Sequence, residues 1–168
     1  MTLQSTSFWD FSNQLYDRDG ISQICLQLQA EFGLDVNLLL FCYWAANFDE
    51  MPSEPEWNKI LEFSTPWKNN IVQPLRNARN SLKSEFVSHN DDPKYTVLRE
   101  RIKLDELAAE KLQQEFIQSC TTIAESQDSQ HFSTAKALSN VSYLFSKLGI
   151  KITEEIIKKL EAISAKII

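Results

Sequence analysis

Apolar residues recur along most of this chain at the three- and four-residue spacing of amphipathic α-helices. A clear stripe lies between Gly20 and Gly33, where the glutamines fall off the apolar face. Its members are Ile21, Ile24, Cys25, Leu28 and Phe32. This spacing places the side chains on one face of a helix. No alternating pattern typical of strands outlasts the helical ones, so we predict an all-α protein.

The stretch from Asp35 to about Phe48 differs from the others because it is apolar on every side. Only Asp35 and Asn37 supply polar groups at its start. A helix that is hydrophobic all round has to be surrounded by other elements, and this one is too short to cross a membrane. We therefore predict a single-domain bundle of about seven helices around a buried central helix at about 35–48.

The other helices are predicted from capping residues and from breaks between apolar stripes. The expected ranges are about 8–17, 21–32, a short helix near 57–61, then 66–87, 93–125, 133–148 and a last helix capped by Thr153. Thr65-Pro66 is a typical helix start, so a break is expected before Pro66. Pro74 should bend the helix that follows, because its ring removes a donor and crowds the preceding turn.

A polar segment at 126–130 divides the predicted helices into two groups. We expect a helical core domain over 1–125 and a C-terminal helical pair over 126–168 that packs on the same domain. Within the core, the long helix at about 93–125 is a candidate antiparallel partner for the helix that begins at Pro66.

Composition favours a cytosolic protein. The 168 residues suffice for one domain with a sizeable core. Three widely spaced cysteines, Cys25, Cys42 and Cys120, favour buried reduced thiols over disulfides. The N-terminal residues lack the basic and apolar regions of a signal peptide, and no long apolar run follows, so we expect a cytoplasmic location and no membrane contact.

Charge is distributed unevenly along the chain. Residues 1–65 carry 2 Lys/Arg and 10 Asp/Glu, whereas residues 66–103 carry 8 Lys/Arg and 4 Asp/Glu. An acidic N-terminal third beside a basic middle is consistent with internal docking or with a polar surface for a partner.

Motifs of known catalytic centres are absent from the sequence. His89 and His131 lie beside predicted loops without a partner set. The Asp91-Asp92 pair directly precedes Pro93, which fits a loop and a helix cap better than a magnesium site for diphosphate substrates. Close Cys or His pairs and glycine-rich phosphate loops do not occur. We therefore expect no metal and no cofactor, and favour a protein that is not an enzyme.

Two sets of polar residues remain as candidate sites. Asp35 and Asn37 either cap the central helix and fix neighbouring backbone, or face a pocket where exposed N–H groups favour an anion. The second set is a basic surface on the helix from Pro66, formed by Lys68, Arg76, Arg79 and Lys83. Three interpretations of it stay open: a solvated face, a surface for phosphate, nucleic acid or an acidic protein, and internal pairing with Asp35 or another acid of the N-terminal third.

Four stretches of the chain form a recognisable set: Phe8–Ser12, the Asp35–Cys42 core with its D-V-N-L-L-L-F string, the P-L-R-x-x-R segment at Pro74–Arg79, and Lys103–Glu110. Together they resemble a proteobacterial family of short all-helical cytosolic proteins classed as a domain of unknown function. The resemblance runs from about Phe8 to Gln118 and leaves the C-terminal part uncovered. It implies a bacterial cytoplasm and a site at Asp35, Asn37 and Pro74–Arg79, but no particular reaction.

Three functions are compatible with these observations. We favour a non-enzymatic partner-binding or regulatory adaptor protein, including a homo-oligomer, with the long helix and the Ile-rich C-terminal helix as contact surfaces. One alternative is a small anionic-ligand binder or enzyme whose pocket is formed by Asp35, Asn37, Arg76 and Arg79. The other is a nucleic-acid-binding protein that uses the basic surface. The acidic net charge and the lack of a recognised motif disfavour nucleic acid.

Overall fold

The computed structural model describes residues 7–89, 91–123 and 131–168, which form one helical domain without strands. Its elements are α1 (Phe8–Tyr16), α2 (Ile21–Phe32), α3 (Val36–Ala46), α4 (Glu54–Trp67), η1 (Lys68–Val72), α5 (Gln73–Ser84), η2 (Val87–His89), α6 (Pro93–Ser119), α7 (Thr134–Lys147) and α8 (Glu154–Ala165).

The predicted all-α class is confirmed. The polar segment predicted at 126–130 lies outside the described residues. None of the described helices has the length and apolar character needed to cross a bilayer.

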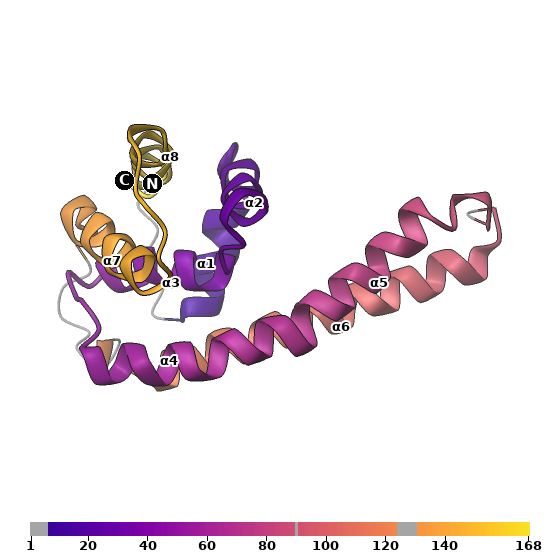
Figure 1. Cartoon of the computed structure of the whole chain (residues 1–168), viewed down its shortest axis with the longest axis horizontal. Helices are drawn as coiled ribbons and strands as arrows, with labels where there is room; N and C mark the ends of the chain where they lie inside the picture. Colours follow the sequence, from indigo (N-terminus) through magenta and orange to yellow (C-terminus); the bar gives the residue numbers. More distant parts are fainter. Residues whose placement is uncertain (1–6, 90, 124–130) are drawn as a thin grey trace.

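Helix α3 forms the centre of the bundle. Every residue from Asn37 to Ala46 is buried. The ring of Phe41 packs against Phe8 of α1 and Trp57 of α4, with centroids 5.7 and 5.5 Å apart, respectively. Helix α7 packs along another side of α3 (Figure 1). Burial of each large apolar side chain stabilises the fold by roughly 1.5–3 kcal/mol. The predicted buried central helix is confirmed, although it ends at Ala46.

The capping residues that the sequence indicates begin these helices. Asp35 Oδ1 accepts a hydrogen bond from the backbone N–H of Asn37 at 3.0 Å. The side chains of Ser7 and Thr153 accept in the same way at the starts of α1 and α8. Gly33 ends α2 with φ 63°, a left-handed conformation that favours glycine. N-capping side chains and C-terminal glycines therefore determine where most of the bundle helices start and stop.

The predicted break before Pro66 is wrong. Helix α4, the π-helical turn η1 and α5 form one continuous rod, with Pro66 inside α4 (Figure 1). Side chains on both sides of Pro66 pack against α6: Phe63 stacks on Phe116 with centroids 3.9 Å apart. Trp67 Nε1 donates to the carbonyl of Ala109 at 3.0 Å. These contacts hold the backbone helical against its local preference.

A π-helical turn accommodates Pro74. In a regular α-helix its ring would crowd the carbonyl four residues earlier. Instead the backbone N–H of Gln73 donates to the carbonyl of Lys68, five residues back. This wider turn ends where α5 begins, so that Pro74 lies in the first turn of α5, a position that proline tolerates.

The rod and α6 pair as an antiparallel hairpin, as the sequence predicts, and the distal half of this hairpin projects from the bundle (Figure 1). We call residues 73–89 and 91–103 the arm. No residue of α5 is buried, and Ile71 and Phe86 are 39% and 45% exposed. Helix α5 therefore packs on α6 and stays partly exposed along its whole length. Helix α6 ends at Ser119, before the predicted Glu125.

Helices α7 and α8 share one hydrophobic core with α1–α4. The Tyr43 hydroxyl of α3 donates to the carbonyl of Leu160 in α8 at 2.9 Å. The apolar face of α8 is buried within the chain through Ile156, Leu160, Ile163 and Ile167. Because this chain already covers that face, it is not available for the partner contact that the sequence suggests.

Pro66→Ala should raise the free energy of unfolding by about 1–3 kcal/mol, because it restores a backbone donor inside a continuous helix. The measurement is equilibrium unfolding in urea. Pro55→Ala is the matched control. Pro55 lies in the first turn of α4, where its missing N–H would have no helical partner, so we expect a change below about 0.5 kcal/mol. Destabilisation by Pro66→Ala would contradict this account.

Candidate functional site

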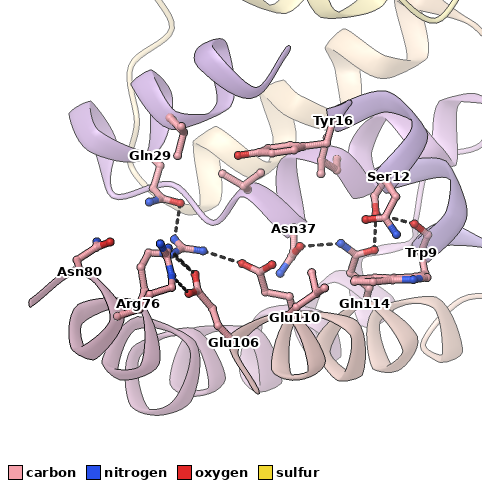
Figure 2. A pocket seen from close by; sticks show the side chains of 16 residues that line it. Trp9, Ser12, Tyr16, Gln29, Asn37, Arg76, Asn80, Glu106, Glu110 and Gln114 are labelled. Atoms are coloured by element: carbon pink, nitrogen blue, oxygen red, sulfur yellow. Dashed lines mark hydrogen bonds and ion pairs between the residues drawn. The ribbon is translucent and has the colours of Figure 1, made fainter. Parts of the chain in front are cut away.

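A pocket of about 410 Å³ lies between α1, α2 and α3 on one side and the α5–α6 hairpin on the other (Figure 2). Its apolar walls include Leu26, Val36, Leu40 and Leu107. Its polar lining includes Ser12, Tyr16, Gln29, Asn37, Arg76, Arg79, Asn80, Glu106, Glu110 and Gln114. The polar groups form two sets, one at each end of the view in Figure 2.

A chain of buried side-chain hydrogen bonds forms the inner end. Ser12 Oγ donates to Gln114 Oε1 and Gln114 Nε2 donates to Asn37 Oδ1, both at 2.7 Å. Asn37 Nδ2 donates to Gln113 Oε1 at 2.9 Å. Gln113 Nε2 donates to Asp35 Oδ2 at 2.7 Å. We call these five residues the amide chain. It ties α6 to α1 and α3 through polar groups alone.

Asp35 sets the direction of every hydrogen bond in the amide chain. Both of its oxygens accept from N–H donors, as an ionised carboxylate does. Gln113 must therefore present its NH₂ group to Asp35 and its carbonyl to Asn37, and the same alternation continues to Ser12. Burial raises the pKa of Asp35, and the hydrogen bonds from Gln113 and Asn37 oppose this rise.

Four charged residues form the outer end of the pocket, and we call them the ion-pair cluster. Arg76 pairs with Glu106 at 2.8 Å and with Glu110 at 2.6 Å. Arg79 Nε pairs with Glu106 Oε2 at 2.6 Å. Arg76 Nη1 also donates to Gln29 of α2 at 2.7 Å. The acids that pair with the arginines thus belong to α6, and not to the N-terminal third as the internal-pair hypothesis assumes.

The two glutamates of the cluster have opposite pKa shifts. Burial alone would raise the pKa of Glu106, but the hydrogen bonds and charges of Arg79 and Arg76 outweigh it and lower the pKa. Burial raises the pKa of Glu110 despite its pairing with Arg76. Burial also raises the pKa of Tyr16, and Glu110 adds to that rise. Perturbed carboxyl groups in a pocket are typical of binding and catalytic sites.

The candidate residues do not share one environment. Asn37, Arg76 and Arg79 line the same pocket. Asp35 lies beside Asn37 in a narrow cavity, which Lys68 and Arg76 also line. Lys68 Nζ donates to the carbonyl of Gly33, whereas Lys83 is exposed. The basic surface stays a prediction, and two of its four members are already paired with glutamates.

The sequence patterns do not predict that a polar face of α6 lines the site. Glu106, Glu110, Gln113 and Gln114 recur at helical spacing and face the bundle, together with Ala109 and Ile117. The apolar residues of α6 do not all mark this inward face, since Leu112 is 55% exposed. The available signal is the helical spacing of these polar residues, part of which lies in the Lys103–Glu110 segment of the resemblance.

Metal and thiol chemistry have no supporting geometry in the described part of the chain. Within residues 7–89, 91–123 and 131–168, no group of three or more His, Cys, Asp or Glu is placed to hold a metal ion. Cys25, Cys42 and Cys120 are free thiols. Burial raises the pKa of Cys25 to about 12, so this thiol is not a nucleophile at neutral pH.

The chain matches a known protein family over most of the bundle and the arm. Residues 7–117 match the family model described as "Protein of unknown function (DUF2390)". This range includes every residue that lines the pocket and leaves α7 and α8 outside. No curated protein and no solved structure matches the chain.

Asp35→Asn should lower the free energy of unfolding by about 1–3 kcal/mol despite its equal size. Asparagine offers one acceptor where two donors converge, so its NH₂ group faces another N–H. Chemical denaturation measures the change. Asp92→Asn is the control, because Asp92 is an exposed cap that accepts from Lys94 N and Asn caps equally well. Equal effects of the two substitutions would contradict the directed amide chain.

Glu106→Gln should lower the free energy of unfolding at pH 7 by about 2 kcal/mol, because both arginines lose a charged partner that is 9% exposed. A carboxyl group with a lowered folded-state pKa stabilises the fold above its usual value of 4.5. That contribution is lost as the pH falls through the folded-state pKa, so the difference between variant and wild type should vanish there.

Unfolding curves for the two proteins from pH 7 down to pH 3 test this. Glu115→Gln is the control, since Glu115 is 55% exposed and its nearest cation, Lys111, lies 3.9 Å away. It should change stability by less than about 0.5 kcal/mol. A Glu106→Gln deficit that stays constant over this pH range would be incompatible with the ion-pair cluster.

Proposed function

Because the chain belongs to the DUF2390 family, whose description assigns no activity, we propose a function from the site itself: the protein binds a small molecule in the pocket between α1–α3 and the α5–α6 hairpin. The observation that supports this is the convergence of apolar walls and four charged side chains on one cavity. Its volume of about 410 Å³ is in the range of small-molecule sites.

The rim of the pocket favours an occupant with an apolar part. Leu26 and Leu107 line the cavity and are 50% and 45% exposed. A ligand that covered both would remove apolar surface from water, at roughly 25 cal/mol per Å². Polar groups deeper in the pocket would then fix its orientation.

A simple anion is a poorer match than the sequence suggests. Arg76 and Arg79 already pair with Glu106 and Glu110, so the cluster has no formal net charge. An anion alone would meet Glu110 as well as the arginines. Because Arg76 and Arg79 are paired with glutamates, they do not support the alternative of nucleic-acid binding.

We propose binding and not catalysis. Ser12, the aliphatic hydroxyl among the residues that line the pocket, is bonded to Gln114 at 2.7 Å. An activated nucleophile needs a base within hydrogen-bond reach, and a neutral amide does not act as one. A bacterial cytoplasmic setting, expected from the sequence, fits the proposal and stays a prediction.

Leu26→Trp should abolish small-molecule binding, because the larger side chain covers the mouth of the pocket. Ligand-observed NMR with a mixed set of aromatic and aliphatic fragments measures it. Leu112→Trp is the matched control, because Leu112 is 55% exposed and lies outside the residues that line the pocket. If no fragment contacts the wild type, or if both variants bind alike, the pocket is not the binding site.

A second candidate function is partner binding through the arm, in which arms of two copies pack together. The supporting observation is the apolar surface at its tip: Phe86, Val87, Val97 and Leu98 are 45–59% exposed. No residue of α5 is buried by its pairing with α6, so apolar side chains of the arm stay in contact with water. Exposed apolar surface of this kind is typical of interaction sites. This candidate and the pocket use different parts of the molecule.

Light scattering after size exclusion should therefore give the mass of a dimer. Val97→Glu combined with Leu98→Glu should give a monomer with unchanged helical circular dichroism. Leu148→Glu, at a site 40% exposed beyond the end of α7, should leave the dimer intact. A monomeric wild type at every concentration would exclude the paired arms.

A further inference from the structure

The ion-pair cluster has hydrogen-bonding capacity that its own pairs do not use. Arg79 donates to Glu106 from Nε at 2.6 Å and from Nη2 at 3.4 Å. In the described part of the chain, no acceptor meets Arg79 Nη1. Glu110 Oε1 accepts from Arg76 at 2.6 Å, and no donor among residues 7–89, 91–123 and 131–168 meets Oε2. Arg79 Nη1 and Glu110 Oε2 are therefore available for hydrogen bonds to a ligand.

The two residues that carry these groups line the same space. Arg79 and Glu110 both line the main pocket, and both line an adjoining cavity of about 220 Å³. The two cavities also share Glu106 and Leu107. The adjoining cavity continues along α6 past Leu104, which is 65% exposed. The hollow is thus polar where the cavities meet, and both Leu104 and the cationic Lys103 line its outer part.

A ligand with a single charge satisfies only half of this arrangement. A carboxylate on Arg79 would leave Glu110 Oε2 without a donor, and an ammonium on Glu110 would leave the free edge of Arg79 without an acceptor. A ligand that displaced water from either group without replacing its hydrogen bond would lose on the order of 1–3 kcal/mol. A zwitterion supplies both complements at once, and charge-assisted hydrogen bonds of this kind are strong.

We infer that the pocket takes a free α-amino acid with a large apolar side chain. Its carboxylate would accept from Arg79, its ammonium would donate to Glu110 Oε2, and its side chain would cover Leu26 and Leu107. The Tyr16 hydroxyl, drawn in the same pocket in Figure 2, is a further polar neighbour of this position. The inference rests on the proposed function and names the ligand class of that site.

Burial of Glu110 is consistent with this assignment. Its pKa is raised chiefly because burial disfavours the charged form. An ammonium group at hydrogen-bond distance compensates for that loss of solvation, whereas a second carboxylate would add to it. The site therefore selects against ligands that carry a negative charge alone.

The test is isothermal titration calorimetry of the full chain with three probes of one shape: L-phenylalanine, 3-phenylpropionate and 2-phenylethylamine. We expect L-phenylalanine to bind and each analogue to bind at least about tenfold more weakly, one charged contact being lost in each. L-leucine should bind as well. Glu110→Gln should weaken L-phenylalanine binding and leave the weak binding of 3-phenylpropionate unchanged or improved. Glu115→Gln should alter neither.

Equal binding of L-phenylalanine and either analogue would overturn the zwitterion assignment and leave the pocket in place. Failure of both amino acids to bind would also overturn it. In that case, fragment binding that Leu26→Trp abolishes would preserve the proposed function, and its absence would remove both. The probe series on the wild type decides the assignment even if Glu110→Gln does not fold.

Discussion

The buried carboxylate of Asp35 is the interaction on which the rest of the site depends. It accepts one hydrogen bond from the backbone N–H of Asn37, at the start of α3, and another from the side-chain NH₂ group of Gln113 in α6. Because a carboxylate only accepts, it imposes one direction on the amide chain that ends at Ser12. The most apolar helix of the bundle is thus joined to α6 by a strictly ordered polar contact. Such a contact is satisfied in only one register between α3 and α6, whereas apolar packing alone would tolerate several.

This contact explains how the pocket is built. The C-terminal half of α6 is fastened to the bundle by the amide chain and by the bond from the backbone of Phe8 to Gln118 at 2.9 Å. Its N-terminal half leaves the bundle with α5 as the arm (Figure 1). The ion-pair cluster lies where the two halves meet, and Gln29 of α2 joins it to the bundle. A ligand at this position would contact both the bundle and the base of the arm.

The sequence predicts the parts of the fold that local physics controls. The apolar run after Asp35 has to be buried, and caps such as Ser7, Asp35 and Thr153 satisfy backbone donors next to them. The break before Pro66 is wrong because Phe63 and Trp67 bind α6, which is distant in sequence. The inward polar face of α6 is missed because burial of Gln113 and Gln114 requires partners that only the tertiary structure supplies. Asn37, Arg76 and Arg79 line one pocket, but their hydrogen-bond and ion-pair partners cannot be predicted from sequence spacing.

Exchange of side-chain amide protons tests the central claim most directly. In a nitrogen-15 NMR experiment, the NH₂ protons of Asn37, Gln113 and Gln114 should exchange with water at least about 100-fold more slowly than those of exposed glutamines such as Gln27, because their exchange requires local opening of the bundle. All three should lose this protection together in Asp35→Asn. If these amides exchange as fast as Gln27, or if their protection survives that substitution, Asp35 does not order the amide chain and the account is contradicted.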